Sequence, residues 1–221
     1  MDEGSGADLF VWGGNRNYTL GLSHGNDSAL PERVKLKCNE RRTPLIAGAR
    51  FNRPHVRDIS MSRWHTVLAT NEPRKNVYVC GIGSQARLGR SAQSLPTFEP
   101  LRDFSDTANI VVAGSDHTII VTETGAVYTF GSNRMAQLGY AIEEGLGVVS
   151  SSSGTKRSGA TSHPNQHSLQ GPVSDVSGVE LDLQVTPRRV QGPLKREVII
   201  GAAASRLHSV AYTASALYTW G

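Results

Sequence analysis

The stretch VYTFGSNRMAQLG at residues 127–139 holds the pattern that decides the fold. It opens with an apolar and aromatic run that stops at glycine, and a Leu-Gly pair follows after a polar interval. The opening run recurs as LFVWG at 9–13, VYVCG at 77–81 and LYTWG at 217–221. The glycine and the leucine are 7 positions apart in all three complete copies. The recurring residues are Gly13, Leu20 and Gly21, then Gly81, Leu88 and Gly89, then Gly131, Leu138 and Gly139.

A second segment also occurs three times, as RWHTVLAT at 63–70, SDHTIIVT at 115–122 and RLHSVAYT at 206–213. In each copy a histidine precedes Ser or Thr, and a further Thr lies five positions after the histidine. The histidines are His65, His117 and His208. Both repeated segments are rich in β-branched and aromatic residues and are bounded by turn residues, which predicts strands. We therefore expect antiparallel strands at 9–12, 77–80 and 127–130, and at 65–70, 117–122 and 208–213.

The spacing between copies predicts the architecture. Successive glycines lie 68, 50 and 90 positions apart, so the bare unit is 50 residues long and the others carry insertions. Strand units of about this length are typical of propeller blades or solenoid turns, which bury their apolar faces by stacking. We expect an all-β incomplete propeller over 9–221, after a disordered 1–8. Its repeats are 9–76, 77–126, 127–216 and 217–221, which predicts three blades and the first strand of a fourth, unpartnered within its own blade.

These linked motifs resemble the regulator of chromosome condensation repeat family. The resemblance implies a β-propeller that has seven blades when complete, so we expect this chain to be a piece of a longer protein. The opening FVWGGNRNYTLG also resembles the repeat block of inhibitor of Bruton tyrosine kinase-like proteins, in which ankyrin repeats precede the block and BTB domains follow it. Unit two departs from the family pattern, with Cys80 for an aromatic residue and Gly83 for Asn. Ser62 and Ser205 stand where the family has Gly before the histidine, whereas Gly114 follows the pattern.

The composition narrows the class of protein. No apolar run approaches the roughly 20 residues that a membrane helix needs. The acidic N-terminus lacks the apolar core of a secretory signal, and two cysteines are too few for a disulfide-stapled module. We therefore expect an intracellular protein, cytoplasmic or nuclear, without a membrane span.

A basic segment at 33–57 is the first candidate for a partner contact. It holds eight Lys or Arg residues against one Glu. The candidate contact residues are Arg41, Arg42, Arg50, Arg53 and Arg57. Such a patch suits an acidic protein, a phosphoinositide or a nucleic acid. Its only aromatic residue is Phe51, so the insertion at 35–57 is also explained as a solvated loop.

A longer insertion at 143–182 has a different composition. Ser, Gly and Pro fill 17 of its 40 positions and no aromatic residue occurs. Such a segment buries too little apolar surface to offset the entropy of ordering, so we expect a disordered loop. The serines at 150–153 beside Lys156 and Arg157 are either phosphorylation sites or part of an unmodified spacer.

The repeated histidines invite a metal or catalytic interpretation. A catalytic residue is needed once, however, whereas these recur in every unit, which favours a buried imidazole bonded to the backbone of each blade. We predict no metal site and no cofactor. The Gly81-Ile-Gly83 run belongs to the repeat and not to a nucleotide-binding loop, because such a loop opens a helix.

Two functions remain open at this point. The first is a non-catalytic protein-interaction module of an adaptor or regulatory protein, with a kinase or a ubiquitin-ligase component as partner. The second, implied by the founding member of the family, is a guanine nucleotide exchange factor for a small Ran-like GTPase. The same fold serves several functions, so the resemblance does not decide between them.

Overall fold

The computed structural model describes residues 9–34, 36, 54–91, 93–142 and 182–221. Over these residues the chain forms four antiparallel sheets, which we number in chain order. The first sheet has β1 (Leu9–Gly13) and β2 (Ser28–Val34), and the second has β3 (Val56–Met61), β4 (His65–Thr70), β5 (Val77–Gly81) and β6 (Leu95–Pro100). The third has β7 (Ala108–Ala113), β8 (His117–Thr122), β9 (Val127–Ser132) and β10 (Leu183–Arg189), and the fourth has β11 (Gly201–Ala204), β12 (Ser209–Tyr212) and β13 (Leu217–Trp220).

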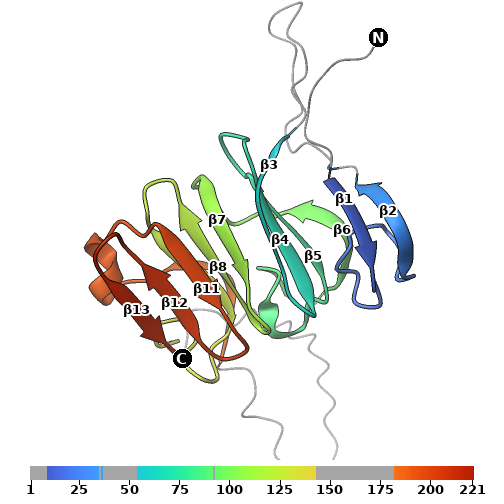
Figure 1. Ribbon diagram of the computed structural model, residues 1–221. Helices are drawn as coiled ribbons and strands as arrows, with labels where there is room; N and C mark the ends of the chain where they lie inside the picture. Colours follow the sequence, from blue (N-terminus) through green and yellow to red (C-terminus); the bar gives the residue numbers. More distant parts are fainter. Residues whose placement is uncertain (1–8, 35, 37–53, 92, 143–181) are drawn as a thin grey trace, which may run out of the picture.

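Successive sheets stand side by side, and each pair of neighbours encloses a core (Figure 1). The central strands of the second sheet, β4 and β5, are buried along their whole length. Their side chains alternate between two cores: Leu68 and Tyr78 face the first sheet, while Val67 and Val79 face the third. A strand that is covered on both faces has a nearly continuous apolar sequence. This explains why polar and apolar residues do not alternate regularly along these strands.

All-β architecture of the propeller type is therefore the observed fold, with the strands where the repeats predict them. The short 3-10 turns η1 (Ser84–Ala86) and η3 (Gly192–Arg196) are the helical elements of the described residues. Within the same residues, no helix is long and apolar enough to cross a membrane.

The sheets and the sequence repeats do not begin at the same residues. After β1, which pairs with β2, each strand that carries the repeat glycine pairs with the histidine strand that precedes it, as β5 does with β4 and β9 with β8. The final strand obeys the same rule, because β13 pairs with β12 along its length. The prediction that 217–221 has no partner in its own blade is therefore wrong. A short turn joins each histidine strand to the following strand as a hairpin, and this local pairing sets the sheet boundary.

At the repeated glycine, the backbones of the two strands of the hairpin lie unusually close together. Gly131 has φ +116° and lies opposite His117 in the register of β8 and β9. A Cβ atom here would lie 2.4 Å from the carbonyl oxygen of Asp116 and 2.6 Å from His117 Cα. The end of β9 is thus pressed against the start of β8, which only a residue without a side chain permits.

Apolar side chains are exposed on the two outer sheets. Trp12 on β1 is 62% exposed, and Leu217 on β13 is 68% exposed. In the inner sheets a neighbouring sheet covers the equivalent positions. Cys80 and Phe130, the counterparts of Trp12, are buried, and so are Val77 and Val127, the counterparts of Leu217. Apolar surface is therefore exposed at both ends of the row of sheets.

Candidate functional site

Two of the repeated histidines join neighbouring sheets. His65, on the second sheet, places Nε2 2.8 Å from Thr118 Oγ1 on the third sheet. The Thr118 hydroxyl donates a hydrogen bond to the carbonyl oxygen of Arg87, at 2.8 Å. The imidazole must therefore donate from Nε2, because the hydroxyl has one proton and has already used it. This chain of two hydrogen bonds ties the start of β8 to the second sheet.

The same link recurs one sheet further along. His117 Nε2 lies 2.9 Å from Ser209 Oγ on the fourth sheet, and Ser209 Oγ donates to the carbonyl oxygen of Gln137 at 2.7 Å. At the other end of the row, Thr66 Oγ1 donates to the carbonyl oxygen of Thr19. The histidine and the Ser or Thr that follows it in the repeat thus take part in two different links. The histidine bonds to a hydroxyl of the next sheet along the chain, and the Ser or Thr hydroxyl bonds to a carbonyl oxygen associated with the preceding sheet.

This geometry corrects part of the sequence-based expectation for the histidines. His65 and His117 are fully buried, as expected, but the imidazole Nε2 of each meets a hydroxyl of the next sheet and not a backbone group. His208 holds the matching position on the fourth sheet and is exposed. No sheet of the described chain covers that side of β12 and β13.

The two links differ at the second ring nitrogen. Ser62 Oγ lies 3.1 Å from His65 Nδ1. Gly114 holds the matching position before His117, and His117 Nδ1 is buried without a partner in the described structure. Ser62, which departs from the family pattern in the repeat 9–76, therefore supplies a polar contact that the family-type Gly114 cannot.

Burial keeps both imidazoles neutral. It lowers the pKa of His65 to about 3, assisted by the positive charge of Arg87. It lowers the pKa of His117 to about 4, against the opposing effect of the Asp116 carboxylate. A neutral imidazole with a fixed tautomer suits a structural hydrogen bond.

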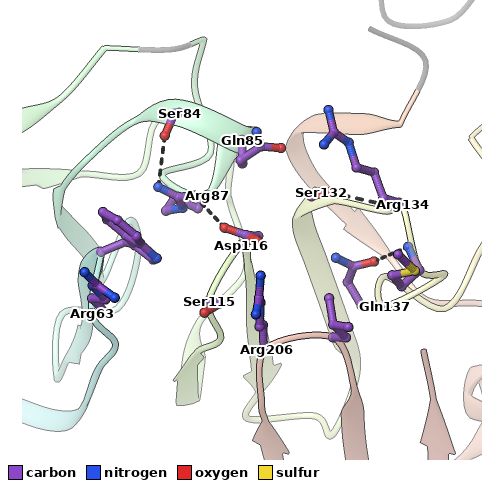
Figure 2. A pocket seen from close by; sticks show the side chains of 13 residues that line it. Arg63, Ser84, Gln85, Arg87, Ser115, Asp116, Ser132, Arg134, Gln137 and Arg206 are labelled. Carbon is purple, nitrogen blue, oxygen red and sulfur yellow. Dashed lines mark hydrogen bonds and ion pairs between the residues drawn. The ribbon is translucent and has the colours of Figure 1, made fainter. Parts of the chain in front are cut away.

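A hollow of about 560 Å³ opens beside these links, where the turns of three sheets meet (Figure 2). The β3–β4, β7–β8 and β11–β12 turns contribute Arg63, Trp64, Ser115, Asp116, Arg206 and Leu207. The end of β9 contributes Ser132, and the loops that follow β5 and β9 contribute Ser84, Gln85, Arg87, Arg134, Met135 and Gln137. These residues come from five separated parts of the chain and meet because the repeat places equivalent turns at the same end of each sheet.

A salt bridge between residues of two sheets belongs to the lining of this hollow. Arg87 Nη2 lies 2.6 Å from Asp116 Oδ1, and the Arg87 side chain is only 4% exposed. Burial lowers the pKa of Arg87, while the hydrogen bond and charge of Asp116 raise it. The guanidinium also lies 5.6 Å from the Trp64 ring centroid, and Arg63 stacks on the same ring at 4.9 Å. Arg87 is thus held by an anion and by an aromatic ring.

The loop that carries Arg87 is built differently from its counterparts. In the other two units an asparagine side chain accepts the backbone N–H of the repeat leucine, Asn15 for Leu20 and Asn133 for Leu138, each at 3.0 Å. Unit two has Gly83 instead, and a Cβ there would lie 2.1 Å from the carbonyl oxygen of Gln93. Its loop also contains Gln85 at φ 61°. Strained backbone of this kind concentrates at functional sites.

Of the partner-contact residues predicted from the basic segment, the structure describes Arg57. Arg41, Arg42, Arg50 and Arg53 fall outside the described residues, as do the disordered segments predicted at 1–8 and, except for Asp182, at 143–182. Arg57 lies on β3 and forms an ion pair with Glu123 beyond the end of β8. It therefore bridges two sheets and does not line the hollow.

Sequence reasoning missed the arginines of the hollow. Arg63 and Arg206 stand two positions before a repeat histidine, and Arg87 and Arg134 lie in the polar interval before a Leu-Gly pair. A comparison of equivalent columns across the units would have found them. Among the described residues, no group of three or more His, Cys, Asp or Glu could hold a metal ion.

Comparison with known proteins supports the repeat assignment. The family model for the Regulator of chromosome condensation (RCC1) repeat matches residues 110–137, from β7 to the loop after β9. The chain therefore carries a regulator of chromosome condensation repeat at residues 110–137. Solved structures with this fold include human WBSCR16, with TM-score 0.64 and 20% identity over 96% of this chain and 43% of that one. Prp20p of Saccharomyces cerevisiae gives TM-score 0.61 and 17% identity over 92% of this chain and 39% of that one.

Similar sequences are also found within much longer proteins. BTB/POZ domain-containing protein 1 of Schizosaccharomyces pombe is 31% identical over 98% of this chain. Human inhibitor of Bruton tyrosine kinase is 29% identical over 97% of it. The chain spans 14% of the first relative's length and 12% of the second's. These two relatives are the kind of protein that the opening motif resembles.

Proposed function

We propose that this chain is a protein-interaction module of an adaptor or regulatory protein and that it acts by binding and not by catalysis. The observation that carries the proposal is the hollow at the ends of three sheets, with Arg63, Arg134 and Arg206 exposed at its mouth. Loops and turns held by a rigid set of sheets are where binding residues concentrate. The similarity to a BTB/POZ protein and to inhibitor of Bruton tyrosine kinase, along almost the whole chain, supports an adaptor role.

The partner we propose is a kinase or a ubiquitin-ligase component. Binding of purified Bruton tyrosine kinase, and of a cullin, to the immobilised chain tests this proposal directly. Saturable binding that weakens when Arg134 and Arg206 are replaced by Gln supports it. A matched control is Arg74→Gln, since Arg74 is exposed in the β4–β5 turn, at the opposite end of the second sheet.

A second candidate is guanine nucleotide exchange on a small GTPase. Secretion-regulating guanine nucleotide exchange factor of Mus musculus is 27% identical over 97% of this chain and 48% of its own length. The Prp20p structure is described with its binding to Gsp1p and histones. Release of a fluorescent GDP from a Ran-like GTPase measures this activity. Acceleration by the chain would favour exchange over the adaptor role.

The basic segment at 33–57 is proposed as a second contact, for an acidic protein, a nucleic acid or a phospholipid headgroup. Its described arginines are Arg33 on β2 and Arg57 on the edge strand β3, where Arg57 lies beside Glu123. Binding of anionic vesicles to the wild type and to Arg57→Gln, with the Arg41, Arg42, Arg50 and Arg53 variants in parallel, tests this proposal.

A further inference from the structure

The hollow has an unbalanced charge. Its lining includes four arginines, and Asp116 is the single acidic residue among them. That carboxylate is taken by Arg87, at 2.6 Å. Arg63, Arg134 and Arg206 form no ion pair with any residue that the structure describes. Three exposed guanidinium groups around one concave surface favour an anionic ligand.

The aromatic residue of the hollow decides between two classes of anion. Nucleic-acid sites combine basic side chains with aromatic rings on which bases stack. The Trp64 ring is the aromatic surface in the lining, and Arg63 at 4.9 Å and Arg87 at 5.6 Å already lie over it. The ring therefore serves to hold two guanidinium groups in place and offers a poor platform for a base. This arrangement favours a ligand that presents carboxylates.

The rest of the lining suits a peptide. Met135 is 53% exposed, and Leu207 lies on the opposite β11–β12 turn. Ser84 and Ser115 add hydroxyl groups between the arginines. A volume of about 560 Å³ lies within the usual range of ligand pockets, roughly 300–1,000 Å³. It accepts a short segment of chain and excludes a folded domain.

We propose that this hollow binds a short acidic peptide segment of a partner protein, whose carboxylates pair with Arg63, Arg134 and Arg206. The guanidinium fork matches a carboxylate with two parallel hydrogen bonds, which gives orientation as well as attraction. Apolar side chains of the peptide contact Met135 and Leu207. This inference rests on the proposed protein-interaction function and names the chemistry of the partner.

The experiment measures fluorescence anisotropy of a labelled eight-residue peptide of Asp and Glu with one central Leu, titrated with the full chain. The matched peptide replaces every Asp and Glu by Asn and Gln, and an eight-nucleotide oligo-dT represents nucleic acid. The protein variants are wild type, Arg134→Gln/Arg206→Gln, Arg63→Gln and the control Arg74→Gln. All four replaced arginines are exposed, and circular dichroism and urea unfolding check that each variant keeps the fold.

The proposal requires that the acidic peptide binds wild type and that the double variant weakens binding at least about tenfold, the range expected for loss of charged partners. Arg74→Gln must stay within about twofold of wild type, because a single remote charge contributes little at physiological salt. Failure of the acidic peptide to bind, an equal loss with Arg74→Gln, or tighter binding of oligo-dT through the same arginines would overturn it.

The failure of this inference differs from the failure of the proposed function. If the kinase or the cullin binds wild type and the Arg134→Gln/Arg206→Gln variant equally, the interaction function stands and the hollow is not its site. If no protein partner binds but the acidic peptide does, the hollow recognises peptides and the proposed partner class is wrong.

Discussion

His117 and Ser209 are 92 positions apart in the sequence, and their Nε2 and Oγ atoms are 2.9 Å apart in the structure. The Ser209 hydroxyl donates a hydrogen bond to the carbonyl oxygen of Gln137. One side chain of the third sheet, one of the fourth and one loop carbonyl thus form a continuous link. His65, Thr118 and Arg87 repeat the arrangement one sheet earlier.

Removing the hydroxyl group from the link between His65 and Arg87 tests how much this link contributes to stability. Thr118→Val keeps the shape of the side chain and leaves His65 Nε2 and the Arg87 carbonyl without their shared partner. We expect the free energy of unfolding to fall by about 1–3 kcal/mol, the cost of unpaired buried polar groups. Urea unfolding followed by circular dichroism measures it. Thr118→Ser restores the hydroxyl, as in Ser209, and should recover most of the loss.

The repeated glycine allows a comparison between two copies of one position. Gly131→Ala places a Cβ 2.4 Å from the Asp116 carbonyl oxygen, whereas Gly13→Ala, at φ +104°, meets no atom within 4 Å. Both substitutions strain the backbone, but only the first also forces two strands apart. We expect Gly131→Ala to lower the free energy of unfolding by about 1–3 kcal/mol more than Gly13→Ala. Equal losses in thermal or urea unfolding would contradict the role assigned to this column.

The buried imidazoles predict a dependence of stability on pH. The pKa of His65 is lowered to about 3 and that of His117 to about 4, below the ordinary value of 6.5. The unfolded chain therefore binds more protons than the folded chain at pH values between these limits. Stability is fully present above pH 6.5 and falls as the pH falls toward 4, by up to about 1.4 kcal/mol per pH unit for each histidine.

The measurement for this prediction is urea unfolding at several pH values between 7 and 4. His117→Gln removes one of the two titrating groups, and we expect a shallower loss of stability with acid than in wild type. The carboxylates of the protein contribute equally to both chains, so the difference between the two slopes isolates His117. Parallel slopes would show that His117 is not held neutral.

The ion pair between sheets predicts coupling between two sites. Asp116→Asn leaves the nearly buried guanidinium of Arg87 without its anion, and Arg87→Met leaves Asp116 without its cation. The double variant removes both charges together. We expect each single change to cost more than half of the double change, with a coupling energy of about 0.5–3 kcal/mol in a double-mutant cycle. Additive losses would mean that the pair does not hold the second and third sheets together.

The repeats alone predicted the strands, the glycine turns and the burial of His65 and His117. These features depend on local pattern, because a β-branched and aromatic run bounded by turns forms a strand wherever the sheet lies. The all-β class and the stacking of sheets followed from the same pattern, since one sheet with two apolar faces cannot bury them alone. The copies of the two repeated segments, with their fixed spacing, predict the strands and the stacked sheets without any knowledge of contacts between distant residues.

Only the tertiary structure decided which groups meet across the sheets. The repeat runs from one glycine-ended strand to the next, but hairpin pairing places β5, β9 and β13 third in their sheets. The strand at 217–220, expected to be unpartnered, is therefore the partner of β12. The hydroxyl partners of His65 and His117 are on the following sheet, so no spacing within one unit could reveal them. The hollow gathers Arg63, Arg134 and Arg206 because equivalent turns align at one end of successive sheets. Contacts between sheets depend on how the sheets stack, and that stacking is a property of the folded chain as a whole.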